Sequence, residues 1–205
     1  MNVISDILYW ISTGLLVPVI VLLIFFFIRA LLLIGSFFGE YMQNRRVNAS
    51  LGARISKLTV ADAPAFAASL PAGSGSLFEA YARKIAESAG DQARTDLLLS
   101  EFEIASDKNI ATSKVLTKMG PILGLMGTLI PMGPALVGLA QGDIASMAYN
   151  MQVAFATTVV GLTVSAIGFC TQQAKERWAV ARVALLEYLA QVTGDARNAE
   201  RRAVQ

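Results

Sequence analysis

Three long stretches of the chain contain no Asp, Glu, Lys or Arg and are long enough to cross a lipid bilayer. They run from Ile7 to Ile28, from Met119 to Gly142 and from Ile144 to Ala174. A helix needs about 20 residues to span the hydrocarbon core of a membrane. The pattern therefore predicts three transmembrane helices. A short turn at Gln141–Asp143 separates the last two, which favours a helical hairpin.

The segment between the first and second spans is more polar and has helical periodicity. Within residues 76–88, apolar side chains recur at helical spacing, and Gly90 marks the end of this predicted helix. A second helix is expected to begin at Asp91. No helix breaker follows up to Met119, so this helix is expected to run unbroken into the second span.

Other parts of the chain carry signals that interrupt or end a helix. Ala63-Pro64 and residues 70–75 are read as breaks. After the third span an apolar stripe continues to Val192, where Thr193-Gly194 is expected to end the helix and leave residues 195–205 as a fraying tail. No alternating β pattern is present, so the predicted fold class is all-α.

The predicted organisation is that of an integral membrane protein with cytoplasmic helical extensions. Its four parts are a first transmembrane helix that runs on into the cytoplasm (1–39), a cytoplasmic helical region (40–114), the transmembrane hairpin (115–174), and a cytoplasmic C-terminal helix and tail (175–205).

The first apolar stretch is interpreted as an uncleaved span. A signal peptide begins with positive charge and ends at small residues. Here the N-terminus carries Asp6 and no Lys or Arg, and Phe25–Phe27 stands where small residues would be needed.

The positive charges are confined to two regions. Of the 17 Lys and Arg residues, 11 lie between Arg29 and Lys118 and 6 lie between Lys175 and Arg202. Because cytoplasmic loops carry an excess of Lys and Arg, both regions are placed in the cytoplasm. The N-terminus is therefore predicted to lie outside the cytoplasm and the C-terminus inside it.

Composition removes several classes of function. A net charge of +2 gives no reason to expect nucleic acid binding. The chain has no His, so the commonest metal ligand and general base are missing, and neither a metal site nor an enzyme is expected. The single cysteine, Cys170, is interpreted as a small buried hydrophobe.

Arg29 directly follows the first uncharged stretch and has two interpretations. Its side chain either snorkels to phosphates at the cytoplasmic interface or pairs inside a helical bundle. The apolar residues that continue after it favour snorkelling.

The second span has a stripe of small residues on one helical face. Gly120, Gly124 and Gly127 are spaced by four and three residues, and Thr128 lies beside them. Small residues allow helices to approach closely in lipid. The density of Gly and Pro also leaves carbonyl groups free, which need polar partners or a water-lined cavity.

The third span carries hydroxyl groups among small residues. Thr158, Gly161, Ser165 and Gly168 fall on one helical face, and Thr157 adjoins it. A hydroxyl in a membrane helix often satisfies only its own backbone, so packing alone stays an alternative. Because the second span opposite also bears a threonine, this stripe of the third span is a candidate pore wall. Its lining residues would be Thr157, Thr158 and Ser165.

The hairpin resembles a known family in two motifs. Residues 120–129, GPILGLMGTL, resemble the A-P-L-L-G-L-L-G-T-V signature of the MotA/TolQ/ExbB proton channel family. Residues 156–162, ATTVVGL, resemble the A-T-A-x-G-L core of that family's following span. Three spans are similar to the TolQ/ExbB branch, since the MotA branch has four.

The resemblance implies a function and a set of partners. Family members form a pentameric ring around a dimer of a single-span subunit similar to MotB, TolR or ExbD, which carries an aspartate in its membrane helix. Ion flow, of H⁺ or alternatively Na⁺, is coupled to mechanical work through that partner. The implied location is the bacterial inner membrane, and no cofactor is implied besides the transported ion.

The family's residues carry over by position. Thr128 and Thr158 match its pore threonines, whose hydroxyls are expected near the partner's carboxylate. Pro121 matches the proline at the cytoplasmic end of the second span. The family's small packing positions correspond to Gly124, Gly127 and Gly161.

One position departs from the family pattern. TolQ-like and ExbB-like chains often have a glutamate five residues before the third-span threonine, and Val153 stands there in this chain. The departure favours a divergent stator subunit that relies on its partner's carboxylate. A non-conducting membrane scaffold of an envelope complex is the alternative.

Overall fold

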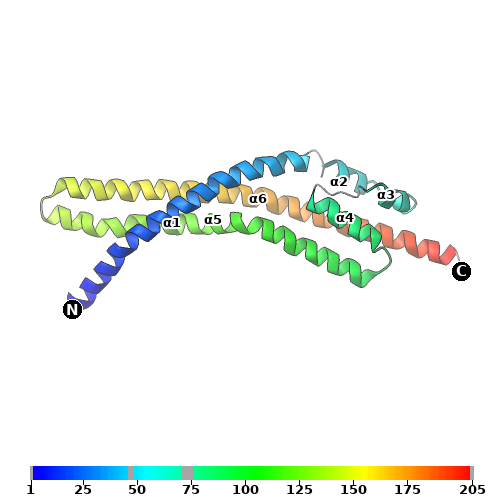
Figure 1. The fold of residues 1–205 in the computed structure, drawn as a ribbon, viewed down its shortest axis with the longest axis horizontal. Coiled ribbons are helices and arrows are strands. Elements are labelled where there is room, and N and C mark those ends of the chain that lie inside the picture. Colours follow the sequence, from blue (N-terminus) through cyan, green and yellow to red (C-terminus); the bar gives the residue numbers. More distant parts are fainter. Residues whose placement is uncertain (1, 46–48, 71–75, 204–205) are drawn as a thin grey trace. The chain divides into compact units, whose positions relative to one another are not determined.

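The structure is a computed structural model that describes residues 2–45, 49–70 and 76–203. Within these residues the chain is helical and has no strand, which confirms the all-α class (Figure 1). The helices are α1 (Asn2–Gln43), α2 (Ala49–Ile55), α3 (Ala63–Ser69), α4 (Leu77–Glu87), α5 (Gln92–Ala140) and α6 (Ile144–Ala203).

Three of these helices, α1, α5 and α6, are long and apolar enough to cross a membrane, as predicted. Helix α5 runs unbroken from Gln92 into the second uncharged stretch. The turn that follows contains Gly142, whose φ of 74° lies in the left-handed region that favours glycine. The backbone N–H of Ser146 donates to Oδ1 of Asp143 (3.0 Å), which caps the start of α6.

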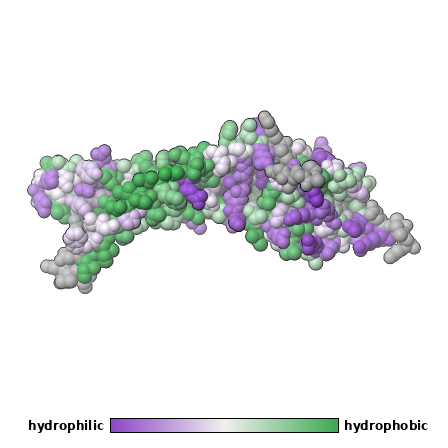
Figure 2. All heavy atoms as spheres, viewed as in Figure 1, coloured by the Kyte–Doolittle hydropathy of each residue, from purple (hydrophilic) through white to green (hydrophobic). Residues whose placement is uncertain are grey.

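The chain divides into two compact units. Unit 1 comprises Met1–Ser36 and Ala111–Gln173, and unit 2 comprises Phe37–Ile110 and Ala174–Gln205. Unit 1 holds the three uncharged stretches except for Ala174, the last residue of the third. Figure 2 shows hydrophobic residues gathered along the α1 part of unit 1, as expected for a surface that faces lipid.

The core of unit 1 is built on one stripe of α1. Its most buried positions follow a seven-residue repeat, which keeps one side of a helix against its neighbours. These are Val19, Leu23, Ala30 and Leu33. They pack on Leu116 and Leu123 of α5 and on Val164 of α6.

The core of unit 2 brings together α2, α3, α4 and the parts of α5 and α6 that belong to this unit. Its fully buried side chains include Ile55, Phe78, Ile85, Phe102, Leu186 and Leu189. Helix α4 begins as the sequence predicts, because the hydroxyl of Ser76 accepts a hydrogen bond from the N–H of Glu79 (3.2 Å).

The expected end of α6 at Thr193-Gly194 is wrong, because the helix continues to Ala203. Val192 and Ala196, on either side of these residues, are both buried in the unit 2 core. The hydroxyl of Thr193 donates to the carbonyl of Leu189 (2.8 Å). Burial on both sides therefore outweighs the roughly 1 kcal/mol that a glycine costs inside a helix.

The break expected at Ala63-Pro64 is also wrong, since these residues open α3. Proline is tolerated in the first turn of a helix, where its missing N–H would have no partner. Helix α3 ends at Ser69, and Leu70 is extended. Residues 71–75, where the second break was predicted, lie outside the described residues.

Candidate functional site

The α5–α6 hairpin of unit 1 holds the candidate site, and its two helices meet at direct backbone contact. A Cβ atom placed on Gly120 would lie 2.6 Å from the carbonyl oxygen of Gly161. A Cβ on Gly161 would lie 2.6 Å from the carbonyl oxygen of Gly120 and 2.9 Å from Cα of Gly124. Only glycine allows this approach at Gly120 and Gly161.

The same contact line continues toward the hairpin turn. A Cβ on Gly127 would lie 2.6 Å from Cβ of Thr157, whose side chain is only 6% exposed. Gly124 differs, because a Cβ there would make ordinary contacts of 3.5 Å with Gly161. We call the line of Gly120, Gly124, Gly127, Thr157 and Gly161 the hairpin seam.

Pro121 and Ser165 are connected through a backbone carbonyl at one end of the seam. Pro121 has no N–H, so it cannot bond the carbonyl of Thr117 four residues earlier. The hydroxyl of Ser165 on α6 donates to that carbonyl oxygen (2.9 Å). A side chain of the neighbouring helix therefore satisfies the group that the proline leaves free.

The predicted pore residues divide into two groups. Thr128 and Thr158 are partly exposed, and each hydroxyl donates to a carbonyl of its own helix, Leu125 (2.7 Å) and Ala154 (3.1 Å) respectively. Their oxygen lone pairs remain available to accept a hydrogen bond. Thr157 and Ser165 instead face α5 within the hairpin. Their part in an ion pathway stays a prediction.

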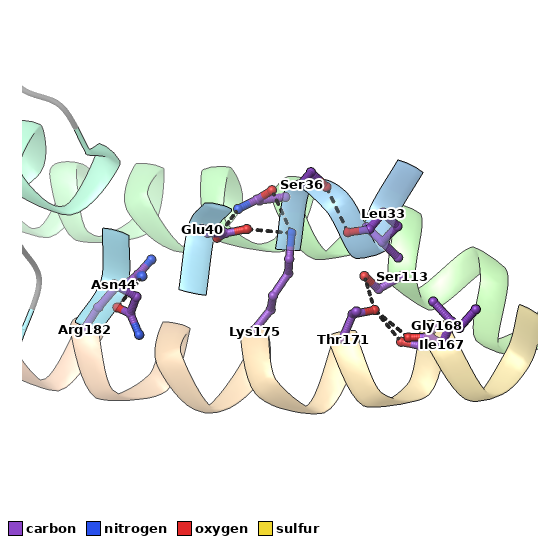
Figure 3. Close-up of polar contacts among 11 residues, drawn as sticks. Leu33, Ser36, Glu40, Asn44, Ser113, Ile167, Gly168, Thr171, Lys175 and Arg182 are labelled. Carbon is purple, nitrogen blue, oxygen red and sulfur yellow. Dashed lines mark hydrogen bonds and ion pairs between the residues drawn. The ribbon is translucent and has the colours of Figure 1, made fainter. Parts of the chain in front are cut away.

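Sequence reasoning missed one buried hydroxyl pair. The hydroxyl of Thr171 donates to Oγ of Ser113 (3.1 Å), and both side chains are buried (Figure 3). The hydroxyl of Thr171 also lies 2.9 Å from the carbonyl oxygens of Ile167 and Gly168. The helical spacing of Gly161, Gly168 and Thr171 along α6 was the available signal.

Cys170 is exposed, so the expectation of a buried hydrophobe is wrong. The physical reason is helical phase. Gly168 and Thr171 face α5, and a residue two positions after Gly168 points to the opposite side of a helix.

Arg29 is also exposed, and its guanidinium lies 5.8 Å from the ring centroid of Phe25. Within the chain it is therefore on the surface of α1. This position is compatible with snorkelling, and the role of Arg29 stays a prediction.

The family model of the MotA/TolQ/ExbB proton channel family matches residues 74–186, which is more than half of the chain. The chain belongs to this family. The match covers α4, α5 and most of α6, and so includes every residue of the hairpin seam. No curated protein and no solved structure matches the chain.

Family membership and the three apolar helices together make this a membrane protein of a proton channel family. The two transmembrane stretches of its hairpin contain no Asp, Glu, Lys or Arg. A proton channel needs ionisable or hydrogen-bonding groups along its path. In this hairpin such groups are hydroxyls, side-chain amides such as those of Asn150 and Gln152, and backbone carbonyls.

Proposed function

We propose that the chain is the ring-forming subunit of a channel that couples ion flow to mechanical work through a partner subunit. Membership of the proton channel family supports the ion-conducting role. The absence of Asp, Glu, Lys and Arg from both hairpin stretches supports a divided site, in which a membrane aspartate of the partner supplies the carboxylate. On this proposal the chain is not an enzyme, and H⁺ or Na⁺ is the transported ion.

The observation that carries the proposal is the closed hairpin seam. Gly120 and Gly161 bring the two backbones into contact, and Thr157 fills the space beside Gly127. An ion therefore has no route between α5 and α6 of one chain along this line. The path we propose runs along the exposed surface of the hairpin, where Thr128 and Thr158 present their hydroxyl oxygens to another chain.

This placement supports an assembly of several chains. A hydroxyl on the surface of one hairpin lines a path only when other chains enclose it, which favours a ring of copies around the partner. We propose a homopentamer around a dimer of a single-span MotB/TolR/ExbD-like subunit in the bacterial inner membrane. The confinement of all 17 Lys and Arg residues to residues 29–118 and 175–202 supports a periplasmic N-terminus and a cytoplasmic C-terminus.

The test measures proton flux through the complex purified with its partner and reconstituted into vesicles. We expect Thr158→Val to reduce flux by about tenfold, which corresponds to the loss of one hydrogen bond of about 1.4 kcal/mol. The matched control is Thr163→Val. Thr163 is exposed on the same helix, and its hydroxyl makes the same kind of bond, to the carbonyl of Val159 (2.8 Å).

Equal flux in wild type and Thr158→Val would contradict a pathway role for Thr158. A complex that assembles with its partner but shows no flux in any variant would instead favour the non-conducting scaffold. Assembly is checked in each variant by the mass of the complex in detergent.

A further inference from the structure

Unit 2 contains a buried ion pair that the channel proposal does not use. Nζ of Lys175 on α6 lies 2.8 Å from Oε2 of Glu40 on α1, and the Lys175 side chain is only 6% exposed. Asn109 of α5 closes the network. Its amide donates to Oε1 of Glu40 (3.0 Å), and its carbonyl oxygen accepts from Lys175 (3.4 Å). The charge of Glu40 is therefore already balanced.

A second cation, Arg182, lies about two turns further along the same face of α6. Its Nη2 donates to the side-chain oxygen of Asn44 (2.7 Å) (Figure 3). Its Nε is buried and has no hydrogen-bond partner among the described residues. Burial lowers the pKa of Arg182 below its ordinary value, and the charge of Glu40 opposes that shift. A buried donor without an acceptor is costly, so this N–H favours an acceptor from outside the chain.

A cavity of about 220 Å³ adjoins these groups. Its walls include Glu40, Lys175 and Arg182, together with Ser76 and Ser106. Two cations against one carboxylate give the cavity an excess of one positive charge. The planar fork of an arginine matches the oxygens of a phosphate group better than any other side chain does.

The cavity is placed at the edge of a membrane span. Lys175 is the first charged residue after the uncharged stretch of α6. Trp178, another wall residue, stacks on Phe37 (5.5 Å between ring centroids) and lies 5.9 Å from Tyr41. Trp and Tyr are enriched at membrane–water interfaces, where basic pockets between helices bind lipid headgroups.

We propose that this cavity binds a phosphate group, with Arg182 as the directional donor and Lys175 as a supporting charge. The phosphate comes from the headgroup of an anionic phospholipid or from the free anion. Both sources present the same oxygens to Arg182. This site is separate from the hairpin seam, and the proposal does not depend on ion conduction.

The test titrates the purified full-length chain in a neutral detergent with phosphatidylglycerol and with diacylglycerol of the same acyl chains. Binding is followed by native mass spectrometry and by the shift in melting temperature. We expect phosphatidylglycerol to bind and Arg182→Gln to weaken it about tenfold, the effect of one charge-assisted hydrogen bond. The control is Arg177→Gln, at an exposed arginine on the same helix, with an expected change below about twofold.

Inorganic phosphate distinguishes the two sources. Binding of phosphate alone that depends on Arg182, without binding of phosphatidylglycerol, supports the free anion as ligand. Equal phosphatidylglycerol affinity in Arg182→Gln and Arg177→Gln overturns the proposal, as does equal binding of diacylglycerol. Should Arg182→Gln fail to fold, Arg182→Lys keeps the charge and removes the Nε donor, and the same comparison applies.

Discussion

The hydroxyl of Ser165 on α6 donates a 2.9 Å hydrogen bond to the backbone carbonyl of Thr117 on α5. The acceptor is the carbonyl that Pro121 leaves without its helical N–H partner. Between two packed helices at the end of a membrane span, an unpaired carbonyl is costly. The proline of α5 and the serine of α6 are therefore parts of one arrangement, although they are 44 positions apart in the sequence.

This coupling predicts non-additive effects of two substitutions. Ser165→Ala is expected to destabilise the chain by about 1–2 kcal/mol, because it leaves the partly buried carbonyl of Thr117 without a hydrogen-bond partner from α6. Pro121→Ala restores the amide that α5 lacks. The double variant should therefore regain most of the stability that Ser165→Ala loses. The stability of the two single variants and of the double variant is measured by unfolding the detergent-solubilised chain in a denaturing detergent. Strictly additive changes in the free energy of unfolding would argue against the coupling.

A second prediction separates two glycines of the hairpin seam. Gly161→Ala places a Cβ 2.6 Å from the carbonyl of Gly120, so the helices must move apart, at a cost of about 1–3 kcal/mol. Gly124→Ala makes only ordinary contacts, at 3.5 Å. It is expected to be neutral, or stabilising by up to about 1 kcal/mol through helix propensity. Melting temperatures of the two variants provide the comparison, and equal losses would contradict the closed seam.

The sequence predicted the three spans, the unbroken α5 and the helix at residues 76–88, because hydropathy and helical periodicity are local signals. It did not identify which of two adjacent threonines faces α5. Thr157 packs on Gly127, whereas the stripe predicted from spacing contained Thr158. A helix has 3.6 residues per turn, so spacings of three and four are both compatible with one face. The neighbouring backbone decides between them.

The Glu40–Lys175 pair was not predictable for a different reason. The two residues are 135 positions apart, and their contact depends on how far α1 and α6 are shifted along each other. No local pattern encodes that shift. The continuation of α6 past Gly194 was missed because the core that buries Val192 and Ala196 is built largely from distant segments.

A third prediction concerns this buried pair. Lys175→Met is expected to destabilise unit 2 by about 3 kcal/mol, because Glu40 keeps a largely buried charge without its partner. Lys175→Met combined with Glu40→Met should recover most of that loss. The control is Arg83→Met, which breaks the exposed Arg83–Glu87 pair (2.7 Å) and should cost less than about 1 kcal/mol. Thermal unfolding followed by circular dichroism measures each variant, and a double variant as unstable as Lys175→Met would exclude this explanation.

The last prediction tests the continuous α6 helix at Gly194. No atom lies within 4 Å of a Cβ placed there, and the residue lies inside the helix. Gly194→Ala is therefore expected to stabilise the chain by about 1 kcal/mol and to leave its helicity unchanged or slightly higher.

Gly194→Ala would instead destabilise the chain if the helix ended at this residue. A glycine that follows a helix commonly has positive φ, which alanine adopts only with strain. Gly90→Ala is the reference for that case. Gly90 has a φ of 86°, and a Cβ there would lie 3.2 Å from Cδ of Arg197. We expect Gly90→Ala to lower the melting temperature and Gly194→Ala to raise it. A loss of stability in both variants would place the end of α6 at Gly194.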